Sequence, residues 1–196
     1  MHSIKTMTPT LQQYLNQIHP LSEEPLKAIS ESFSPISFER REVITREGQL
    51  ERYLYFIEVG IQRSYYIKDG KEYIIAFTYP PSFSGIPESF LTGSASLYFL
   101  ETITPTKALR ISRERLDALM DHYREIESLF RKSTESVLSG LIHKHYELMA
   151  YSIEERFKAF ANRSPHLLVM VPHKFIASYL RIDPTNFSKL LSTVKV

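Results

Sequence analysis

The sequence predicts an α+β protein in which an N-terminal antiparallel β-barrel or jelly roll with flanking helices precedes a long helix and a C-terminal helix-turn-helix. Three observations predict this order: strand-like segments separated by turn signals at 35–111, a helical apolar stripe at 125–150, and two short amphipathic helices joined by a turn at 173–192. The predicted domains are residues 1–121 for the barrel with its helices, 122–150 for the long helix and 151–196 for the helix-turn-helix domain.

The composition is that of a folded soluble protein, with 43% hydrophobic and 23% charged residues in a chain of 196. No apolar run approaches the roughly 20 residues needed to cross a bilayer, and the start of the chain lacks the apolar core of a secretion signal. We therefore expect a cytoplasmic protein with no membrane partner. The absence of cysteine excludes disulfides, thiolate metal sites and cysteine nucleophiles.

The segment 35–111 has the pattern of a small all-β unit. Roughly eight short segments rich in Ile, Tyr, Phe and Thr are separated by turn dipeptides. Asp69-Gly70 is a strong hairpin signal, because a type I′ turn needs positive φ at both central residues. Short helices are expected before this segment, at 8–33, and after it from Ser112, whose hydroxyl can cap the next helix.

The predicted long helix carries apolar residues on two faces. One face is a stripe at heptad-like spacing that consists of Phe130, Val137, Leu141 and Leu148. Such a helix packs on two surfaces, of which the second is either another copy of the chain, giving a homodimer, or simply more of the same core. His143 and Glu147 share a face, but two ligands from one helix are too few for a metal site, so we interpret both as solvent-facing and expect no metal.

The most informative constellation is HKFIASYLRIDPTNFSKLLS, residues 173–192. Ala177 is the small residue that two steeply crossing helices need at their closest approach. Asp183 followed by Pro184 is a helix start, because Asp accepts from free amides and Pro has no amide to leave unpaired. Arg181 stands where glycine is usual in the turn. The alternative is an ordinary pair of packed helices.

The charge of this region favours double-stranded DNA as a partner. From Arg156 onward there are seven Lys or Arg residues against one acid, while the rest of the chain is net acidic. The second helix carries short polar and basic side chains that can reach base edges or phosphates. The DNA-binding residues expected here are Lys174, Asp183, Pro184, Thr185, Asn186, Ser188 and Lys189.

The whole chain resembles the Crp/Fnr superfamily of bacterial transcription regulators. The resemblance rests on the helix-turn-helix and on YLYFIEVGIQRSYYIKDGKEYIIAFTYPPSFSGIPESF at 53–90, with Gly60, Asp69-Gly70 and Gly85. It implies a cyclic-nucleotide-binding-type barrel, a dimerisation helix and a DNA-binding unit in that order, and it leaves RNA polymerase as a candidate partner. In the reading helix it places Pro184, Thr185 and Lys189 at base-reading positions and Asp183 and Asn186 at backbone positions.

The residues that hold a cyclic nucleotide in this family are missing. Members that bind cAMP carry Glu directly after the glycine that corresponds to Gly85 and, about ten residues later, an Arg that pairs with the phosphate. Those positions hold Ile86 and Ser96 here, and the nearby Glu88 cannot replace a cation. We expect weak or no cAMP binding in this pocket, no cofactor, and an unidentified small-molecule effector or none.

Two other functions are compatible with parts of the sequence pattern. The runner-up is a small-molecule-binding or protein-interaction module of the same fold without specific DNA binding. A cupin-type barrel enzyme would need clustered histidines, and residues 35–111 contain none. Because no nucleophile elbow, phosphate loop or HExxH motif is present either, we predict no enzyme and no catalytic residue. The segment HLLVMVP at 166–172 is a candidate β-hairpin wing.

Overall fold

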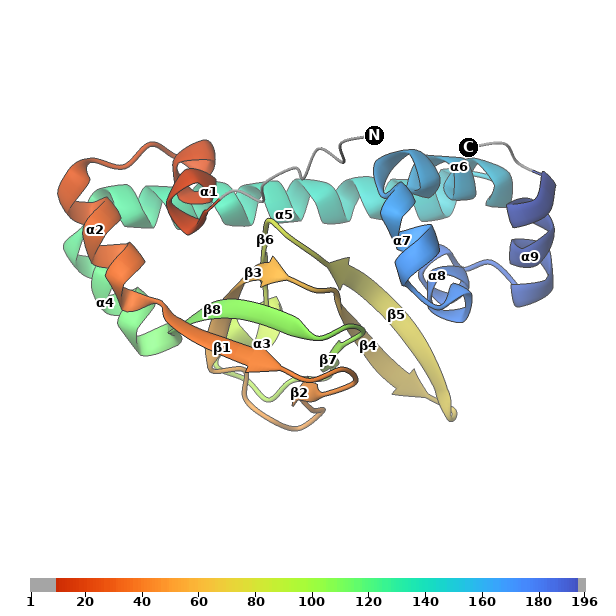
Figure 1. Cartoon of the computed structure of the whole chain (residues 1–196), viewed down its shortest axis with the longest axis horizontal. Helices are drawn as coiled ribbons and strands as arrows, with labels where there is room; N and C mark the ends of the chain where they lie inside the picture. Colours follow the sequence, from red (N-terminus) through yellow and green to blue (C-terminus); the bar gives the residue numbers. More distant parts are fainter. Residues whose placement is uncertain (1–9, 194–196) are drawn as a thin grey trace, which may run out of the picture. The chain divides into compact units, whose positions relative to one another are not determined.

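The strands form two four-stranded antiparallel sheets in the computed structural model, which describes residues 10–193. One sheet has the order β1-β8-β3-β6 and the other β2-β7-β4-β5 (Figure 1). This confirms the predicted jelly-roll character and the number of strands. The strands are β1 Ser34–Phe38, β2 Val43–Thr45, β3 Tyr53–Val59, β4 Gln62–Lys68, β5 Lys71–Thr78, β6 Ser82–Ser84, β7 Phe99–Thr102 and β8 Thr106–Ser112.

Helices precede and follow the strands as predicted. Ser112 ends β8 and caps the next helix, since its Oγ accepts from the amide of Arg115 at 3.2 Å. Thr10 and Gln13 form a capping box at the first helix. The helices are α1 Leu11–Ile18, α2 Glu23–Ser32, α3 Pro87–Thr92, α4 Arg113–His122, α5 Arg124–Ala150, α6 Ile153–Arg163, α7 Pro165–Met170, α8 His173–Leu180 and α9 Pro184–Thr193.

The fold divides into two compact units. The first comprises the chain up to Ser64 together with Phe77–Glu135, and the second comprises Tyr65–Ala76 together with the chain from Ser136 onward. The outer ends of the first and third predicted domains, residues 1–9 and 194–196, lie outside the described residues. The second unit thus combines the tip of the β4–β5 hairpin with the C-terminal helices.

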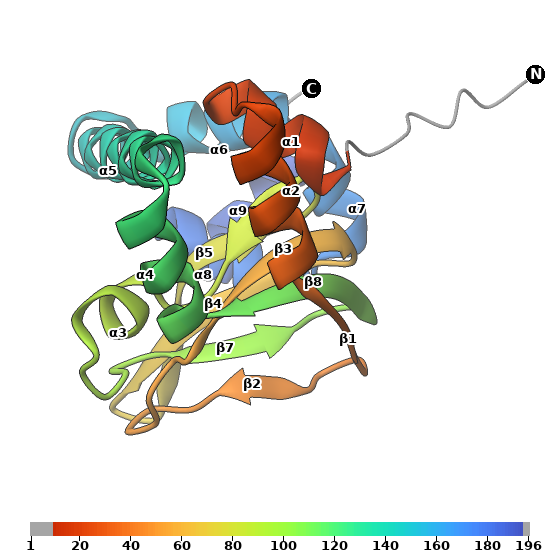
Figure 2. The same ribbon diagram turned by 90° about the vertical axis from the view of Figure 1, so that its left-hand side faces the viewer.

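The core of the first unit lies between its N-terminal helices and one sheet. In Figure 2 the layer with β3 and β8 separates α1 and α2 from the layer with β2 and β7. Leu15, Ile29 and Phe56 are fully buried in this core, where Phe130 of α5 stacks on Phe83 with ring centres 5.7 Å apart. Phe130 therefore packs inside the first unit, and the exposed part of its predicted stripe begins at Val137.

Two turns in the sheets require unusual backbone conformations. Asp69 and Gly70 have φ of 52° and 71°, as the predicted hairpin between β4 and β5 demands. Gly60, between β3 and β4, has φ of +102°, and a Cβ there would lie 2.5 Å from the carbonyl oxygen of Pro105. Only glycine fits that close approach.

The C-terminal helices of the second unit pack around aromatic side chains. Phe157 and Phe187 are buried with ring centres 5.6 Å apart, and Phe160 lies 5.7 Å from Tyr179. The predicted wing at 166–172 is wrong, because α7 occupies most of that segment. Pro165 begins this helix at a position where its missing amide costs nothing.

Candidate nucleic-acid interface

The turn between α8 and α9 is built by a left-handed residue and a capping carboxylate. Arg181 ends α8 with φ 53° and ψ 47°, and the amide of Ile182 donates to the carbonyl of Ala177 at 2.9 Å. Oδ1 of Asp183 accepts from the amides of Thr185 at 2.9 Å and Asn186 at 3.4 Å. The predicted helix-turn-helix and its Asp-Pro start are therefore present.

One face of α9 packs on the unit and the other is free. Phe187 is buried against α6, whereas Thr185, Asn186 and Lys189 are exposed. Ser188 is also exposed, but its hydroxyl donates to the carbonyl of Pro184 at 3.0 Å and is thus partly committed to the helix. The helix carries no acidic side chain, so its outward face is neutral to positive.

A polar cluster joins the end of α5 to the end of α6. Glu147 is only 2% exposed, and its Oε1 accepts from Nη1 of Arg163 at 2.8 Å. Nζ of Lys144 lies 3.7 Å from Oε2 of the same carboxylate, and Nε2 of His143 lies 3.3 Å from Oε1. The prediction that Glu147 faces solvent is therefore wrong.

Burial and charge act in opposite directions in this cluster. Burial would raise the pKa of Glu147, but the hydrogen bond and charge of Arg163 and the charge of Lys144 lower it overall. Burial lowers the pKa of Lys144 to about 8, against the opposing pull of Glu147. The cluster holds more cations than carboxylates, since Arg156 and Arg163 also lower that pKa.

The middle of α5 is exposed on every side. Each residue from 134 to 143 is exposed, including Val137, Leu141 at 57% and Ile142 at 63%. Further along, Met149 is 75% exposed, while Leu148 is half-buried. None of the described helices is both long and apolar enough for a membrane span. Within residues 10–193, the apolar side chains of this segment are therefore left uncovered.

The residues predicted for the nucleotide pocket lie around the start of α3. Ile86 is 1% exposed and packs in the core with Phe38, Tyr55 and Leu100, while Glu88 is exposed. Ser96 is also buried, and its Oγ bonds the backbone of Tyr98 at 2.8 and 2.9 Å. Neither side chain at the two family positions is thus available to a ligand as a charged group.

Sequence reasoning missed a buried carboxylate next to this segment. Glu51 accepts from the hydroxyl of Thr45 at 2.6 Å, and backbone amides including those of Tyr53 and Ile86 also donate to it. Burial raises the pKa of Glu51, although these hydrogen bonds pull it down. It lies two residues before β3, where the local sequence pattern does not distinguish a buried acidic residue from an exposed one in a loop.

Residues 35–123 match the cyclic nucleotide-binding domain family. The match covers the barrel and stops before α5. It runs from the second residue of β1 to just past α4, so the family match and the observed sheets describe the same part of the chain. No curated protein matches the chain.

Solved regulators share the fold over most of the chain. FixK2 from Bradyrhizobium japonicum has a TM-score of 0.70 at 21% identity, with 82% of this chain and 83% of that chain covered. The catabolite activator protein of Thermus thermophilus has a TM-score of 0.57 at 21% identity, covering 89% and 84%. CLP of Xanthomonas campestris, described as a c-di-GMP-responsive global regulator, has a TM-score of 0.61 at 17% identity, covering 86% and 89%. The cyclic nucleotide-binding domain and its C-terminal helices thus have the Crp/Fnr fold that the resemblance predicted.

No three His, Asp or Glu side chains within residues 10–193 are grouped to hold a metal ion. His143 and Glu147 lie 3.3 Å apart within the cluster described above.

Proposed function

We propose that this protein is a homodimeric, DNA-binding transcription regulator of the Crp/Fnr type. The observation that carries the proposal is the two-sided character of α9, which buries Phe187 and exposes Thr185, Asn186 and Lys189. In a helix-turn-helix, the N-terminal residues of the second helix reach base edges while the first helix crosses the backbone. Lys189 supplies the cation that can contact guanine or a phosphate.

Dimerisation through α5 is part of the same proposal. Two recognition helices must be held about one helical turn of DNA apart to read a palindromic site. The exposed apolar residues from Val137 to Met149 offer a seam for a second copy of α5. Leu141 and Ile142 lie at its centre.

We further propose that the barrel does not respond to cAMP. A buried cyclic phosphate needs a charge-assisted partner, and the buried Ser96 cannot supply one. The carboxylate of Glu51 already takes the amide of Ile86 and would repel an anion there. A micromolar affinity for cAMP in calorimetric titration would overturn this part.

The central test is binding to genomic DNA fragments, measured by gel shift at several salt concentrations. Lys189→Ala should weaken specific binding by roughly 5- to 150-fold, which corresponds to about 1–3 kcal/mol for a base contact. Lys158→Ala is the matched control, because this exposed lysine on α6 pairs with Glu154 and is not on α9. The absence of any specific complex at moderate salt, with or without added cell extract, would refute the proposal and favour a module without DNA binding.

A further inference from the structure

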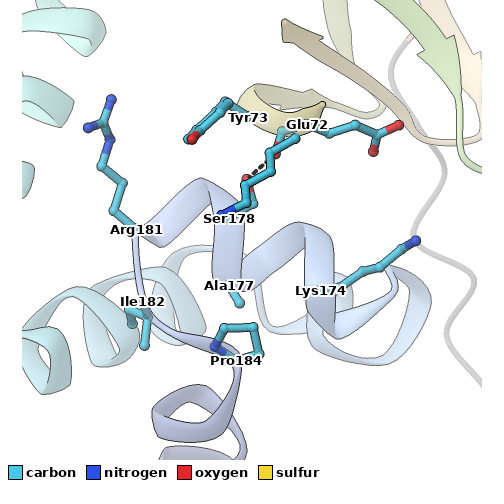
Figure 3. A pocket seen from close by; sticks show the side chains of 9 residues that line it. Glu72, Tyr73, Lys174, Ala177, Ser178, Arg181, Ile182 and Pro184 are labelled. Atoms are coloured by element: carbon cyan, nitrogen blue, oxygen red, sulfur yellow. Dashed lines mark hydrogen bonds between the residues drawn. The ribbon is translucent and has the colours of Figure 1, made fainter. Parts of the chain in front are cut away.

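Ser178 on the first helix of the helix-turn-helix bonds the backbone of the β4–β5 hairpin. Oγ of Ser178 on α8 donates to the carbonyl of Glu72 at 3.2 Å (Figure 3). The same oxygen accepts from the amide of Ile74 at 3.1 Å. Strand β5 lies at the edge of its sheet, so these two backbone groups have no neighbouring strand. Ser178 thus takes the place of a strand partner over one residue pair.

Cations gather around this contact. A pocket of about 340 Å³ lies beside it and is lined from the hairpin by Lys71 and Glu72 and from the helix-turn-helix by Lys174 and Arg181. Figure 3 shows Lys174 and Arg181 extending from opposite ends of α8. Three cationic side chains against one carboxylate leave an excess of positive charge, which an anion would balance.

The position of this charge indicates which anion it meets. Pro184, the first residue of α9, also lines the pocket, so the cations lie beside the start of the proposed reading helix. The first helix of a helix-turn-helix crosses the DNA backbone, where phosphates are spaced along its face. Lys174 on this first helix and Lys71 on the hairpin line the same pocket, so a phosphate bound beside Lys174 would also meet the hairpin.

We propose that the β4–β5 hairpin is part of the DNA interface. Lys71 contacts a backbone phosphate beside Lys174 and Arg181, and the hydrogen bonds of Ser178 hold the hairpin in the position that this contact needs. This inference rests on the proposed function and adds to it a residue from outside the helix-turn-helix. It makes Ser178 a positioning residue, since its hydroxyl bonds the hairpin and not the DNA.

The salt dependence of binding tests the role of Lys71. A lost phosphate contact lowers affinity on every sequence and flattens the plot of log K against log salt by about one unit. We expect Lys71→Ala to bind about 5- to 10-fold more weakly near 0.1 M salt, on specific and nonspecific DNA alike. Lys68→Ala is the control, because Lys68 is exposed on the same hairpin but does not line the pocket.

A double-variant comparison tests the role of Ser178. If Ser178 acts by presenting Lys71, Ser178→Ala should lose the same contact, and the double variant should bind no more weakly than Lys71→Ala alone. Ser178→Thr keeps the hydroxyl and should restore binding. Circular dichroism on each variant establishes that it is folded.

The outcomes distinguish failure of the proposed DNA-binding function from failure of the role given to the hairpin. Wild-type protein that binds no DNA would refute the proposed function and this inference with it. Wild-type binding with an unchanged slope for Lys71→Ala, or with equal effects of Lys68→Ala and Lys71→Ala, would overturn the inference alone. Additive losses in the double variant would overturn the role of Ser178.

Discussion

The ammonium of Lys144 lies 4.0 Å from the centre of the Tyr179 ring, which places a cation of α5 over an aromatic side chain of α8. The same ammonium is 3.7 Å from Glu147, so the lysine is held between a π face and a carboxylate. Its pKa of about 8 records that burial costs more than these two contacts return. The end of the long helix is therefore joined to α8 by a largely buried ammonium whose pKa is lowered to about 8.

Substitution of Lys144 should change how stability depends on pH. The unfolded lysine keeps its proton up to about 10.5 while the folded one releases it near 8, so between these values the unfolded state binds more protons. The wild-type free energy of unfolding should consequently rise as pH increases from 8 towards 10. In Lys144→Met this rise should be lost, and stability at pH 7 should increase by at most about 3 kcal/mol.

Urea unfolding followed by circular dichroism at pH 7, 8 and 9.5 measures the effect of Lys144→Met. Glu147→Gln is the complementary variant, because it leaves Arg163 and Lys144 without their carboxylate and should destabilise the fold by about 3–5 kcal/mol. Equal pH slopes in wild type and Lys144→Met would show that the lysine is not the titrating group.

Arg181→Gly should stabilise the protein and weaken DNA binding at once. A left-handed conformation costs a residue with a Cβ about 1 kcal/mol, and glycine removes this cost. The substitution also removes one cation from the pocket beside α9. Arg41→Gly is the control, since Arg41 has φ of 63° in the first unit and is not among the residues of the interface. Thermal unfolding measures the stability of both variants, and titration with DNA measures their affinity. An equal loss of DNA affinity in Arg181→Gly and Arg41→Gly would refute a specific role for Arg181.

Gly60→Ala should be severely destabilising. A Cβ at this position would lie 2.5 Å from the Pro105 oxygen and 2.6 Å from Oγ1 of Thr106, so the backbone must move. We expect a loss of about 3 kcal/mol or more from overpacking together with backbone strain. Gly48→Ala has the same sign of φ but no atom within 4 Å, and should lose only about 1 kcal/mol. Denaturant midpoints that are equal for the two variants would contradict the steric argument.

Leu141→Asp should separate the proposed dimer into monomers. A charge at the centre of an apolar seam costs several kcal/mol of association, and DNA affinity should fall because two half-sites are no longer bound together. Ser136→Asp carries the same new charge and is exposed on the opposite side of α5, so it should leave the dimer intact. Sedimentation velocity measures the mass of each; a wild-type monomer at micromolar concentration would refute the seam.

Local signals made much of the fold predictable. Asp69-Gly70, the capping Ser112 and the Asp183-Pro184 start each specify a backbone conformation through their own chemistry, and all three are found as expected. The prediction of a wing at 166–172 was wrong, because a short apolar run does not distinguish a strand from a helix. Pro165 is the residue that indicates a helix start there.

Contacts between residues that are far apart in the chain could not be predicted from local sequence patterns. Glu147 is buried because Arg163, sixteen positions away, pairs with it, and no periodicity announces such a pair. The contact of Ser178 with β5 joins residues more than a hundred positions apart. Both concern the arrangement of polar groups, whereas the predicted elements followed from apolar spacing.

The bond between Ser178 and the edge of β5 has a consequence for solubility. An edge strand with free amides and carbonyls is a template on which a strand of another molecule can pair. On slow heating, light scattering from aggregates should therefore begin at a lower temperature for Ser178→Ala than for Ser178→Thr. Equal onset temperatures would show that Ser178 does not protect the strand edge. The Ser178 hydroxyl that positions the hairpin therefore also limits aggregation through the edge of β5.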